Sequence, residues 1–268
     1  MAGVSILLAA RNEADRIGAA IESIRLQSIE DWEIIVVDDG STDETADVVR
    51  SIVDERIRLI VCPPLGLAAA LNRGLSSARA PFVARQDADD LSLPGRLAHQ
   101  IEFLAAKPEV AVVGTDWIEI GRDGEAVRPR VRFVAGRVNT VLPRFNPLAH
   151  TSVIFRRDVV LRAGGYDERL RFAQDYDLWL RLAATGETLW NLELPLVQRS
   201  MTGLNVAARR ERAQIRSELS IRLRDMRRRR RHGLPVRHHV LAIARRLVGL
   251  AVPLGLKREL RRLQGKAP

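Results

Sequence analysis

Apolar residues dominate five short runs in the first 115 residues, and polar stretches separate these runs. Val and Ile are frequent in them, and a run that is apolar at nearly every position predicts a strand buried on both faces. The runs cover residues 4–10, 33–37, 57–61, 81–85 and 110–114. We therefore expect five strands within a central sheet.

Between these runs, apolar residues return every three or four positions, which is the spacing of a helix with one buried face. Alternating strands and helices predict a doubly wound, mainly parallel α/β sheet with helices on both faces. Ligands bind such sheets at the carboxyl ends of the strands. The apolar sets are Ile17, Ile21 and Ile24, then Ala46, Val49 and Ile52, and then Leu97, Ile101 and Leu104.

The rest of the chain is less regular. Glycines and prolines interrupt residues 115–150, which predicts irregular strands and loops there. We expect a further strand at 150–155, an amphipathic helix at 175–184 and a charged helix at 209–231.

This pattern predicts a boundary near residue 204. Residues 1–204 would form one domain with two parts, a regular α/β part over 1–115 and a less regular part over 116–204. Residues 205–268 would form a basic helical tail.

Charge separates the same two regions. The whole chain has a formal net charge of +10. Residues 1–198 carry 23 Lys and Arg against 29 Asp and Glu, whereas residues 199–268 carry 20 against 4. The positive excess therefore lies entirely in the tail and needs an explanation of its own.

Two features indicate the compartment. Cys62 is the single cysteine, so no internal disulfide can form, and a reduced buried thiol is expected. The apolar run at 4–10 is too short for a signal peptide or a spanning helix. We expect a cytoplasmic protein, with peripheral attachment to the inner face of the membrane as an option.

The sequence VVDDGSTDET at 36–45 places two carboxylates at the end of a predicted strand. Asp39 could accept hydrogen bonds from a nucleotide base or ribose, since a carboxylate pairs well with the imide N–H of uracil. Ser41 and Glu44 also have capping-box spacing. An acidic turn that merely caps the next helix is the alternative.

The sequence RQDADDL at 85–91 crowds three carboxylates into four residues directly after a predicted strand. Such charges repel one another unless a cation compensates them. Mg²⁺ and Mn²⁺ prefer oxygen ligands, and Mg²⁺ is often held by one or two carboxylates plus substrate phosphates. We expect Asp89 to ligate the ion, Asp87 to contact ribose or the metal shell, and Asp90 to orient the loop. A solvated acidic turn is the alternative.

The third motif, FAQDYDLWLRL at 172–182, places Asp175 at the start of a predicted helix. Asp175 could be the N-cap of that helix. It could also be a general base, which must come within about 3 Å of the acceptor hydroxyl. Asp177 would point in another direction.

Several isolated polar residues are weaker candidates. Asn12 and Glu13 follow the first strand, Asn72 lies in a predicted helix, and His150 precedes a predicted strand. Helix capping, plain surface exposure or a structural histidine would explain them equally well. The turn GGYD at 164–167 is either a simple loop or part of an acceptor-binding surface.

Several common motifs are missing. No G-x-G-x-x-G follows the first strand, which argues against a nicotinamide or flavin dehydrogenase. The chain also lacks a P-loop, a G-x-S-x-G elbow and a cluster of Cys and His. These absences argue against P-loop NTPases, α/β-hydrolases and zinc sites.

Taken in order, VSILLAARNEADRI, VVDDGSTDET, ARQDADD, GGYDE and QDYDLWLRL resemble glycosyltransferase family 2 over about residues 3–200. The resemblance implies a GT-A fold, which is a Rossmann-like, mainly parallel sheet with helices on both faces. It also implies an inverting enzyme that uses a nucleotide-diphosphate sugar, with a UDP-sugar favoured, and Mg²⁺ or Mn²⁺ as cofactor.

The resemblance assigns roles to individual residues. Asp89 falls on the metal-ligand position of the family's D-x-D motif, and Asp175 falls on its catalytic base. Asp39 is placed at the base of the nucleotide and Asp87 beside the ribose. The positions expected to bind the nucleotide sugar are Ala9, Arg11, Glu13, Asp39, Asn72, Asp87, Ala88 and His150.

Three positions depart from the family pattern. Gln174 stands where a Glu commonly precedes the base. Arg11 replaces an aromatic residue that can stack on the nucleotide base, and a guanidinium plane can stack there too. Met201 takes the place of the His in an Arg-x-His motif that begins at Arg199.

The tail has three interpretations. Arginines and a proline interrupt its apolar second half, so it is not expected to span a bilayer. Leu241, Ala244, Val248 and Ala251 can share one helix face, which favours a basic amphipathic helix on an anionic membrane surface. A solvated or partner-binding helix is the alternative. Nucleic-acid binding is disfavoured because no binding motif accompanies the arginines.

The expected function is transfer of a sugar from a nucleotide-diphosphate sugar to a hydroxyl of a glycan or lipid-linked acceptor, in the synthesis of cell-surface polysaccharide or glycolipid. The alternatives are a nucleotide-sugar-binding protein without transfer activity and a nucleic-acid-binding protein that uses the tail.

Overall fold

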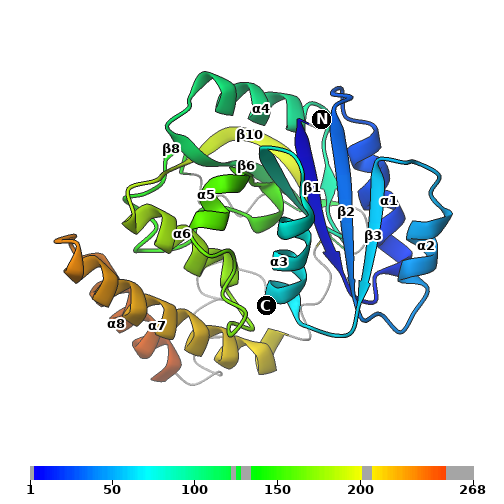
Figure 1. Ribbon diagram of the computed structural model, residues 1–268. Coiled ribbons are helices and arrows are strands. Elements are labelled where there is room, and N and C mark those ends of the chain that lie inside the picture. Colours follow the sequence, from blue (N-terminus) through cyan, green and yellow to red (C-terminus); the bar gives the residue numbers. More distant parts are fainter. Residues whose placement is uncertain (1–2, 122–124, 128–133, 201–206, 252–268) are drawn as a thin grey trace.

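A ten-stranded sheet forms the centre of the protein, in the strand order β3-β2-β1-β4-β9-β6-β10-β5 (Figure 1). Two further short strands lie off this path, β7 beside β6 and β8 beside β10. The computed structural model describes residues 3–121, 125–127, 134–200 and 207–251.

The first half of the sheet is parallel. β1 (Val4–Ala10) lies between β2 (Trp32–Asp39) and β4 (Phe82–Asp87), and β3 (Ile57–Cys62) pairs with the other edge of β2. β1 and β2 are buried at every position, as continuous apolar runs predict. The fifth predicted strand is present as β6 (Val110–Ile120), which is longer than expected.

The second half of the sheet is mixed. β9 (Ile154–Arg156) runs antiparallel to both β4 and β6, whereas β10 (Thr188–Ser200) runs parallel to β6. The short strands at the sheet margin, which are β5 (Leu91–Ser92), β7 (Ala126–Val127) and β8 (Gly136–Arg137), pair antiparallel with their neighbours.

The prediction of a strand at 150–155 is wrong for the first half of that segment. Residues His150–Ser152 form a short 3-10 helix, η1, and β9 begins only at Ile154. The Ser152 hydroxyl donates to the carbonyls of Ala149 and Thr115 at 3.0 and 2.9 Å. Such side-chain bonds compete with a strand for the backbone, which explains the difference.

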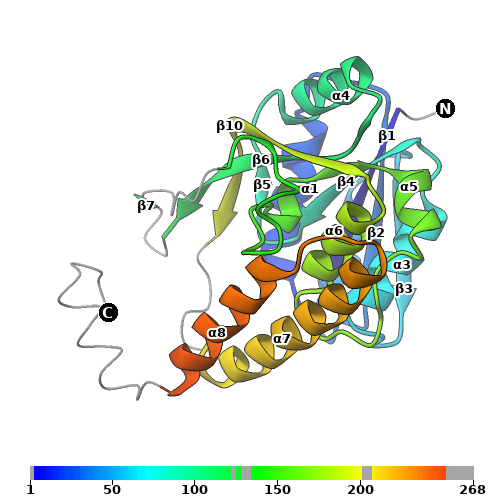
Figure 2. The same cartoon turned by 90° about the vertical axis from the view of Figure 1, so that its left-hand side faces the viewer.

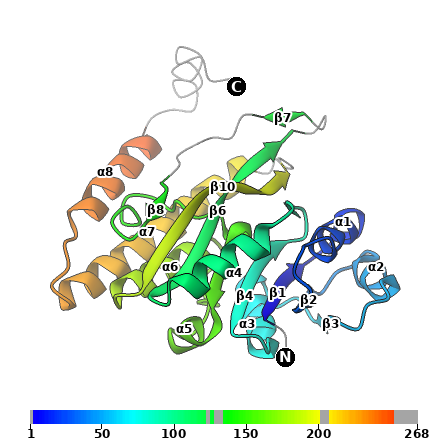
Figure 3. The same cartoon turned by 90° about the horizontal axis from the view of Figure 1, so that it is seen from above.

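One face of the sheet is covered by α1 (Ala14–Arg25), α2 (Thr45–Ser51) and α4 (Arg96–Ala106). Ile6 and Leu8 of β1 point to this face and pack in one cluster with residues of all three helices. Figure 3 shows α1 and α2 at one end of the molecule, beside β3, and the last two helices at the other.

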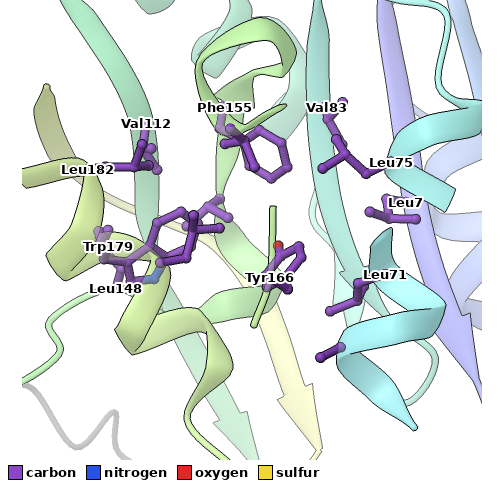
Figure 4. Packing of buried hydrophobic residues seen from close by; sticks show 14 of the residues in the cluster. Leu7, Leu71, Leu75, Val83, Val112, Leu148, Phe155, Tyr166, Trp179 and Leu182 are labelled. Atoms are coloured by element: carbon purple, nitrogen blue, oxygen red, sulfur yellow. The ribbon is translucent and has the colours of Figure 1, made fainter. Parts of the chain in front are cut away.

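The opposite face is covered by α3 (Leu67–Ser77), α5 (Arg157–Arg162) and α6 (Gln174–Ala184). Tyr166, from the turn before α6, is buried between Leu71 of α3 and Trp179 of α6 (Figure 4). Full burial of a large apolar side chain stabilises a fold by about 1.5–3 kcal/mol. This cluster therefore joins the two halves of the sheet into one core.

The capping box expected from Ser41 and Glu44 does not form. α2 begins at Thr45, its N-cap residue Glu44 makes no capping side-chain bond, and Asp43 Oδ1 accepts from the Thr45 N–H at 3.1 Å instead. Ser41 instead donates its backbone N–H to Asp38 Oδ1 at 2.9 Å, so it stabilises the turn before the helix.

The predicted charged helix is present as α7 (Ala207–Arg231), and α8 (Arg237–Ala251) lies against it (Figure 2). α7 packs on α6, and Ile221 belongs to the core cluster of that face. Asp225 on α7 accepts hydrogen bonds from Arg229 and His239 at 2.7 Å, which fastens α8 to α7. Within the described residues, no helix has both the length and the hydropathy to cross a membrane.

Candidate active site

The register of the parallel strands brings the motifs together. Ala9 of β1 pairs with Val37 of β2 on one side and with Asp87 of β4 on the other. The polar segments that follow these three strands therefore start from the same edge of the sheet, as the sequence predicted.

Asn12 binds one of these loops to another. Its backbone has a positive φ of 57°, a region that Asn tolerates better than most residues. Its Oδ1 accepts from the Thr42 N–H at 2.8 Å, and its own N–H donates to the Ser41 hydroxyl at 3.0 Å. The structure thus gives Asn12 a role in shaping the site.

Asp39, at the end of β2, also binds one loop of the site to another. It is buried, and its Oδ1 accepts hydrogen bonds from the backbone N–H groups of Leu65 and Gly66 at 2.6 and 3.1 Å. These bonds fix the loop that leads into α3. A carboxylate has more acceptor sites than these bonds use, so the expected contact with a nucleotide base stays a prediction.

Two buried arginines lie beneath the acidic motif. Arg85 donates to the Leu7 carbonyl at 2.7 Å and pairs with the Asp87 carboxylate. Arg96 donates to the Arg85 carbonyl at 2.7 Å and to Gln86 Oε1 at 2.9 Å. Neither arginine was predicted to have a role. For Arg85 the signal was a cation within an apolar strand, where a charge persists only with a partner.

Arg85 determines the charge of Asp87. Burial raises the pKa of Asp87, but the positive charges of Arg85 and Arg199 and the hydrogen bond from Arg85 contribute to a net lowering. Asp87 is therefore ionised and offers its carboxylate as a hydrogen-bond acceptor.

Asp89 and Asp90 lie in an excess of negative charge. Burial and the neighbouring Asp87 raise the pKa of Asp89, although Arg16 lies 3.9 Å from its Oδ2. Burial, Asp87 and Asp89 raise the pKa of Asp90 to about 7. Asp90 accepts from the Ser200 N–H at 3.1 Å, which fits its expected role in orienting the loop.

The acidic motif fits a hard divalent cation. Among the residues that the structure describes, no three or more His, Cys, Asp or Glu form a ready-made metal cluster. The Asp89 side chain is 34% exposed, and a cation beside it would offset the repulsion that raises its pKa. A single accessible carboxylate suits Mg²⁺ or Mn²⁺, which complete their shells with water and phosphate oxygens.

Glu13 lies near the same motif. Its N–H donates to the Thr45 hydroxyl at 2.8 Å, and its carboxylate pairs with Arg16 at 2.6 Å. Burial raises the pKa of Glu13, and the charge of Asp89 raises it further against the opposing effect of Arg16. Glu13, Arg16 and Asp89 are therefore neighbours.

His150 lies behind Asp87 and is neutral. Burial and the charge of Arg85 lower its pKa to about 3. Its Nε2 shares a hydrogen bond with the Tyr166 hydroxyl at 2.9 Å, and its ring packs edge-on against Tyr166 and Trp179. This bond engages one of the two ring nitrogens, and a contact of His150 with the donor or acceptor stays a prediction.

Asn72 holds the turn at 164–167. Its Oδ1 accepts from the Tyr166 N–H at 2.8 Å, and its Nδ2 donates to the Tyr166 carbonyl and to Glu168 Oε1. A Cβ at Gly165 would lie 2.5 Å from Asn72 Oδ1, so only glycine fits there. Asn72 also lines a cavity of about 510 Å³ beside this turn. The polar atoms of its side chain are hydrogen-bonded to the turn, and a contact of Asn72 with the donor stays a prediction.

Asp175 lies in the first turn of α6. The preceding Ala173 has a positive φ of 57°, which is strained for a residue with a Cβ. Asn146 Nδ2 donates to Asp175 Oδ2 at 2.9 Å. Burial raises the pKa of Asp175, and the charge of Asp87 contributes to the increase. Asp87 and Asp175 are therefore close enough for the charge of one to affect the pKa of the other. A raised pKa suits a carboxylate that acts as a base near neutral pH.

The other candidates are simpler. Asp177 pairs with Arg181 at 2.8 Å, so it points away from Asp175, as expected. Ala9 and Ala88 are buried, where only their backbones could meet a ligand. Arg11 is exposed at the end of β1. Met201 lies outside the described residues.

Comparison with known proteins adds independent evidence. The model of the family "Glycosyl transferase family 2" matches residues 5–162. The amylovoran biosynthesis glycosyltransferase AmsE of Erwinia amylovora is 32% identical over 224 residues, which cover 82% of this chain and 84% of AmsE. The putative glycosyltransferase EpsE of Bacillus subtilis is 35% identical over 199 residues, covering 71% and 70% of the two chains.

Solved structures share the fold. TarS of S. aureus in complex with UDP-GlcNAc superposes with a TM-score of 0.68 at 18% identity, covering 83% of this chain and 66% of TarS. The mannosyltransferase PcManGT of Pyrobaculum calidifontis, in complex with GDP-Man and Mn²⁺, gives 0.64 at 24% identity, covering 84% and 64%. The match of family, relatives and fold leads to one conclusion: this chain belongs to glycosyl transferase family 2 and is a glycosyltransferase with the GT-A fold.

Proposed function

We propose that the protein is an inverting transferase that moves a sugar from a nucleotide-diphosphate sugar, preferably a UDP-sugar, to a hydroxyl of a glycan or lipid-linked acceptor. The observation that carries the proposal is the register of β1, β2 and β4, which brings the acidic motif and the other polar segments to one edge of the sheet. The charge of Asp87 also contributes to the raised pKa of Asp175, so the two carboxylates belong to one site. A donor held at the motif and an acceptor held at Asp175 would be adjacent. The expected setting is cell-surface polysaccharide synthesis, which the names of AmsE and of the succinoglycan biosynthesis protein ExoU of Rhizobium meliloti support.

Three carboxylates have different proposed roles in the transfer reaction. Asp175, held by Asn146, takes the proton of the acceptor hydroxyl as its oxygen attacks the anomeric carbon from the face opposite the leaving diphosphate. Asp87, kept ionised by Arg85, accepts hydrogen bonds from the ribose. Asp89 would hold Mg²⁺ or Mn²⁺, which supplies positive charge to the leaving diphosphate.

A thermal-shift experiment tests the donor site. The melting temperature would be measured with UDP, GDP and other nucleoside diphosphates, each with and without Mn²⁺. We expect UDP to raise it only when Mn²⁺ is present, and Asp89→Ala to remove most of that increase. If no nucleoside diphosphate stabilises the protein under either condition, the donor assignment is wrong.

Turnover separates transfer from binding alone. A nucleotide-sugar-binding protein without activity would be stabilised by UDP yet would neither hydrolyse nor transfer the donor. Slow release of UDP from a UDP-sugar in the presence of Mn²⁺ would exclude that alternative.

We also propose that the helical tail docks on an anionic membrane surface. Arg227, Arg230 and Arg231 of α7 are exposed, and Leu241 at the start of α8 is 68% exposed. The side chains of Val248 and Ala251, expected on the same apolar face, lie outside the described residues. Basic and apolar side chains together suit the headgroup region of a membrane.

Vesicle sedimentation tests this docking. We expect binding to vesicles that contain phosphatidylglycerol and little binding to pure phosphatidylcholine, with a steep loss at high salt. Tight binding to duplex DNA without binding to either vesicle would favour the nucleic-acid interpretation.

A further inference from the structure

A second cavity, of about 430 Å³, opens directly on Asp175. One wall comes from the domain itself and includes Asn146 and Phe145. The other wall comes from α7 and consists of Gln214, Ile215 and Glu218. These three residues lie beyond residues 5–162, the segment that the family model matches.

The wall formed by α7 is held in place by a buried arginine. Arg222 donates to the carbonyls of Pro143 and Arg144 at 2.6 and 3.0 Å, and it pairs with Glu218 at 2.8 Å. The same arginine therefore fixes α7 to the loop that carries Phe145 and Asn146. Both walls keep their positions relative to Asp175, as a preorganised site requires.

The chemistry of the cavity suits a sugar. Gln214 and Glu218 are four residues apart, so they share one helix face and offer an amide and a carboxylate. Ile215 and Phe145 supply apolar surface beside them. Pockets of this kind bind small molecules by apolar contact and orient them with a few polar groups. A sugar presents both an apolar ring face and hydroxyls.

The charge of the cavity narrows the choice of sugar. Asp175 and Glu218 both line it, and among the residues of its lining that the structure describes there is no Lys or Arg. The Arg222 side chain is only 2% exposed and lies behind Glu218. A carboxylate on the acceptor would therefore lie beside the Asp175 carboxylate and the Glu218–Arg222 ion pair, and no described residue of the lining offers it an accessible cation.

We propose that this cavity is the acceptor subsite, that it takes an uncharged sugar, and that Gln214 and Glu218 of α7 determine its specificity. The inference rests on the proposed function. Glu218 accepts a hydrogen bond from a hydroxyl next to the one that attacks, and Gln214 binds a further hydroxyl. The first tail helix is thereby part of the active site.

The test uses three probes of matched size. They are octyl β-D-glucopyranoside, octyl β-D-galactopyranoside and the anionic octyl β-D-glucuronide. Saturation-transfer NMR with the full chain, UDP and Mg²⁺ reports their binding without turnover. UDP release from a UDP-sugar, with and without each probe, reports transfer. We expect a neutral octyl glycoside to bind and to accelerate UDP release, and the glucuronide to do neither.

Variants locate the subsite on α7. Loss of a hydrogen bond to a charged group is worth about 1.5 kcal/mol, or about tenfold in affinity. Glu218→Gln should therefore raise the acceptor KM about tenfold, leave the donor KM and the slow donor hydrolysis unchanged, and reduce discrimination against the glucuronide. Gln214→Ala changes an exposed side chain, keeps the Glu218–Arg222 pair, and should raise the acceptor KM by a smaller factor. The exposed Arg216→Gln, on the same helix but outside the cavity lining, is the matched control and should change neither KM.

Each result has one meaning. If UDP and Mn²⁺ stabilise the protein but no neutral glycoside binds, the subsite proposal fails and the proposed function stands. It also fails if the glucuronide binds as well as the glucoside, or if Gln214→Ala and Glu218→Gln leave the acceptor KM unchanged. If neither nucleotide binding nor donor hydrolysis is found, the proposed function itself fails.

Discussion

The two halves of the molecule build their parts of the site in different ways. The donor side collects short motifs at the ends of parallel strands, where the register alone makes Ala9 a neighbour of Asp87. The acceptor side depends on contacts between residues far apart in sequence, such as Asn146 with Asp175 and Arg222 with Pro143. The proposed donor site is therefore visible in local motifs, whereas the proposed acceptor site depends on contacts that form only when the chain folds.

The largest expected effect tests whether the two sides work independently. Asp175→Asn removes the proposed base, so we expect transfer to fall by about 10²–10⁴-fold. UDP binding should be unchanged, because no donor contact is proposed for Asp175. Steady-state kinetics and a UDP thermal shift measure the two effects. Unchanged turnover in this variant would reject Asp175 as the base.

The next effect concerns the stability of the acceptor side. Arg222→Met breaks a buried ion pair and leaves Glu218 and two carbonyls without their donor. We expect the free energy of unfolding to fall by about 3 kcal/mol. The exposed Arg227→Met should change it by less than about 0.5 kcal/mol. Equal results for both variants in urea denaturation would show that Arg222 does not anchor α7.

A smaller effect should appear in the pH dependence of transfer. Asp175 must be ionised to act as a base, and its raised pKa means that the rate falls at a higher pH than for an ordinary Asp. The Asn146 hydrogen bond favours the ionised form, so Asn146→Ala should raise this pKa further. A bond worth about 1.5 kcal/mol moves the acid limb of the pH–rate profile up by about one pH unit. An acid limb that stays in place would contradict the role of Asn146.

The smallest effect concerns the attachment of α8. Burial raises the pKa of Asp225, but His239 and Arg229 more than offset this, and the net shift is downward. A lowered carboxyl pKa contributes stability above the ordinary pKa of about 3.9 and loses it as the pH falls through the folded value. Hydrogen exchange at low pH should therefore show α8 losing protection. In Asp225→Asn this part of the pH dependence should be absent.

Most of the donor half could be predicted from the sequence. The five predicted strands are present, and Ile17, Ile21 and Ile24 are buried on α1 as expected. Continuous apolar runs and helical periodicity carry this information locally. The capping box at Ser41 failed because Asp38 competes for the same residue.

The buried polar contacts could not be predicted from apolar runs and helical periodicity. The cation within a strand showed that Arg85 needs a partner, but the order of residues did not show that the partner is Asp87 or that Asn72 holds the turn at 164–167. Residues 205–268 were predicted to form a basic helical tail, and the structure adds that Ile221 and Arg222 of this segment contact the core. Whether residue 204 is a functional boundary stays a prediction.

The sequence by itself determined the family, the strands and helices of the first half, and the acidic motifs that follow the strands. Each of these depends on residues close together in the chain, where apolar spacing and turn chemistry are decisive. Only the tertiary structure decided which carboxylates are ionised, which polar groups are already engaged, and what forms the second wall beside Asp175. These properties depend on burial and on charges brought together from distant segments, because the strength of an interaction between charges depends on their distance and on the exclusion of water.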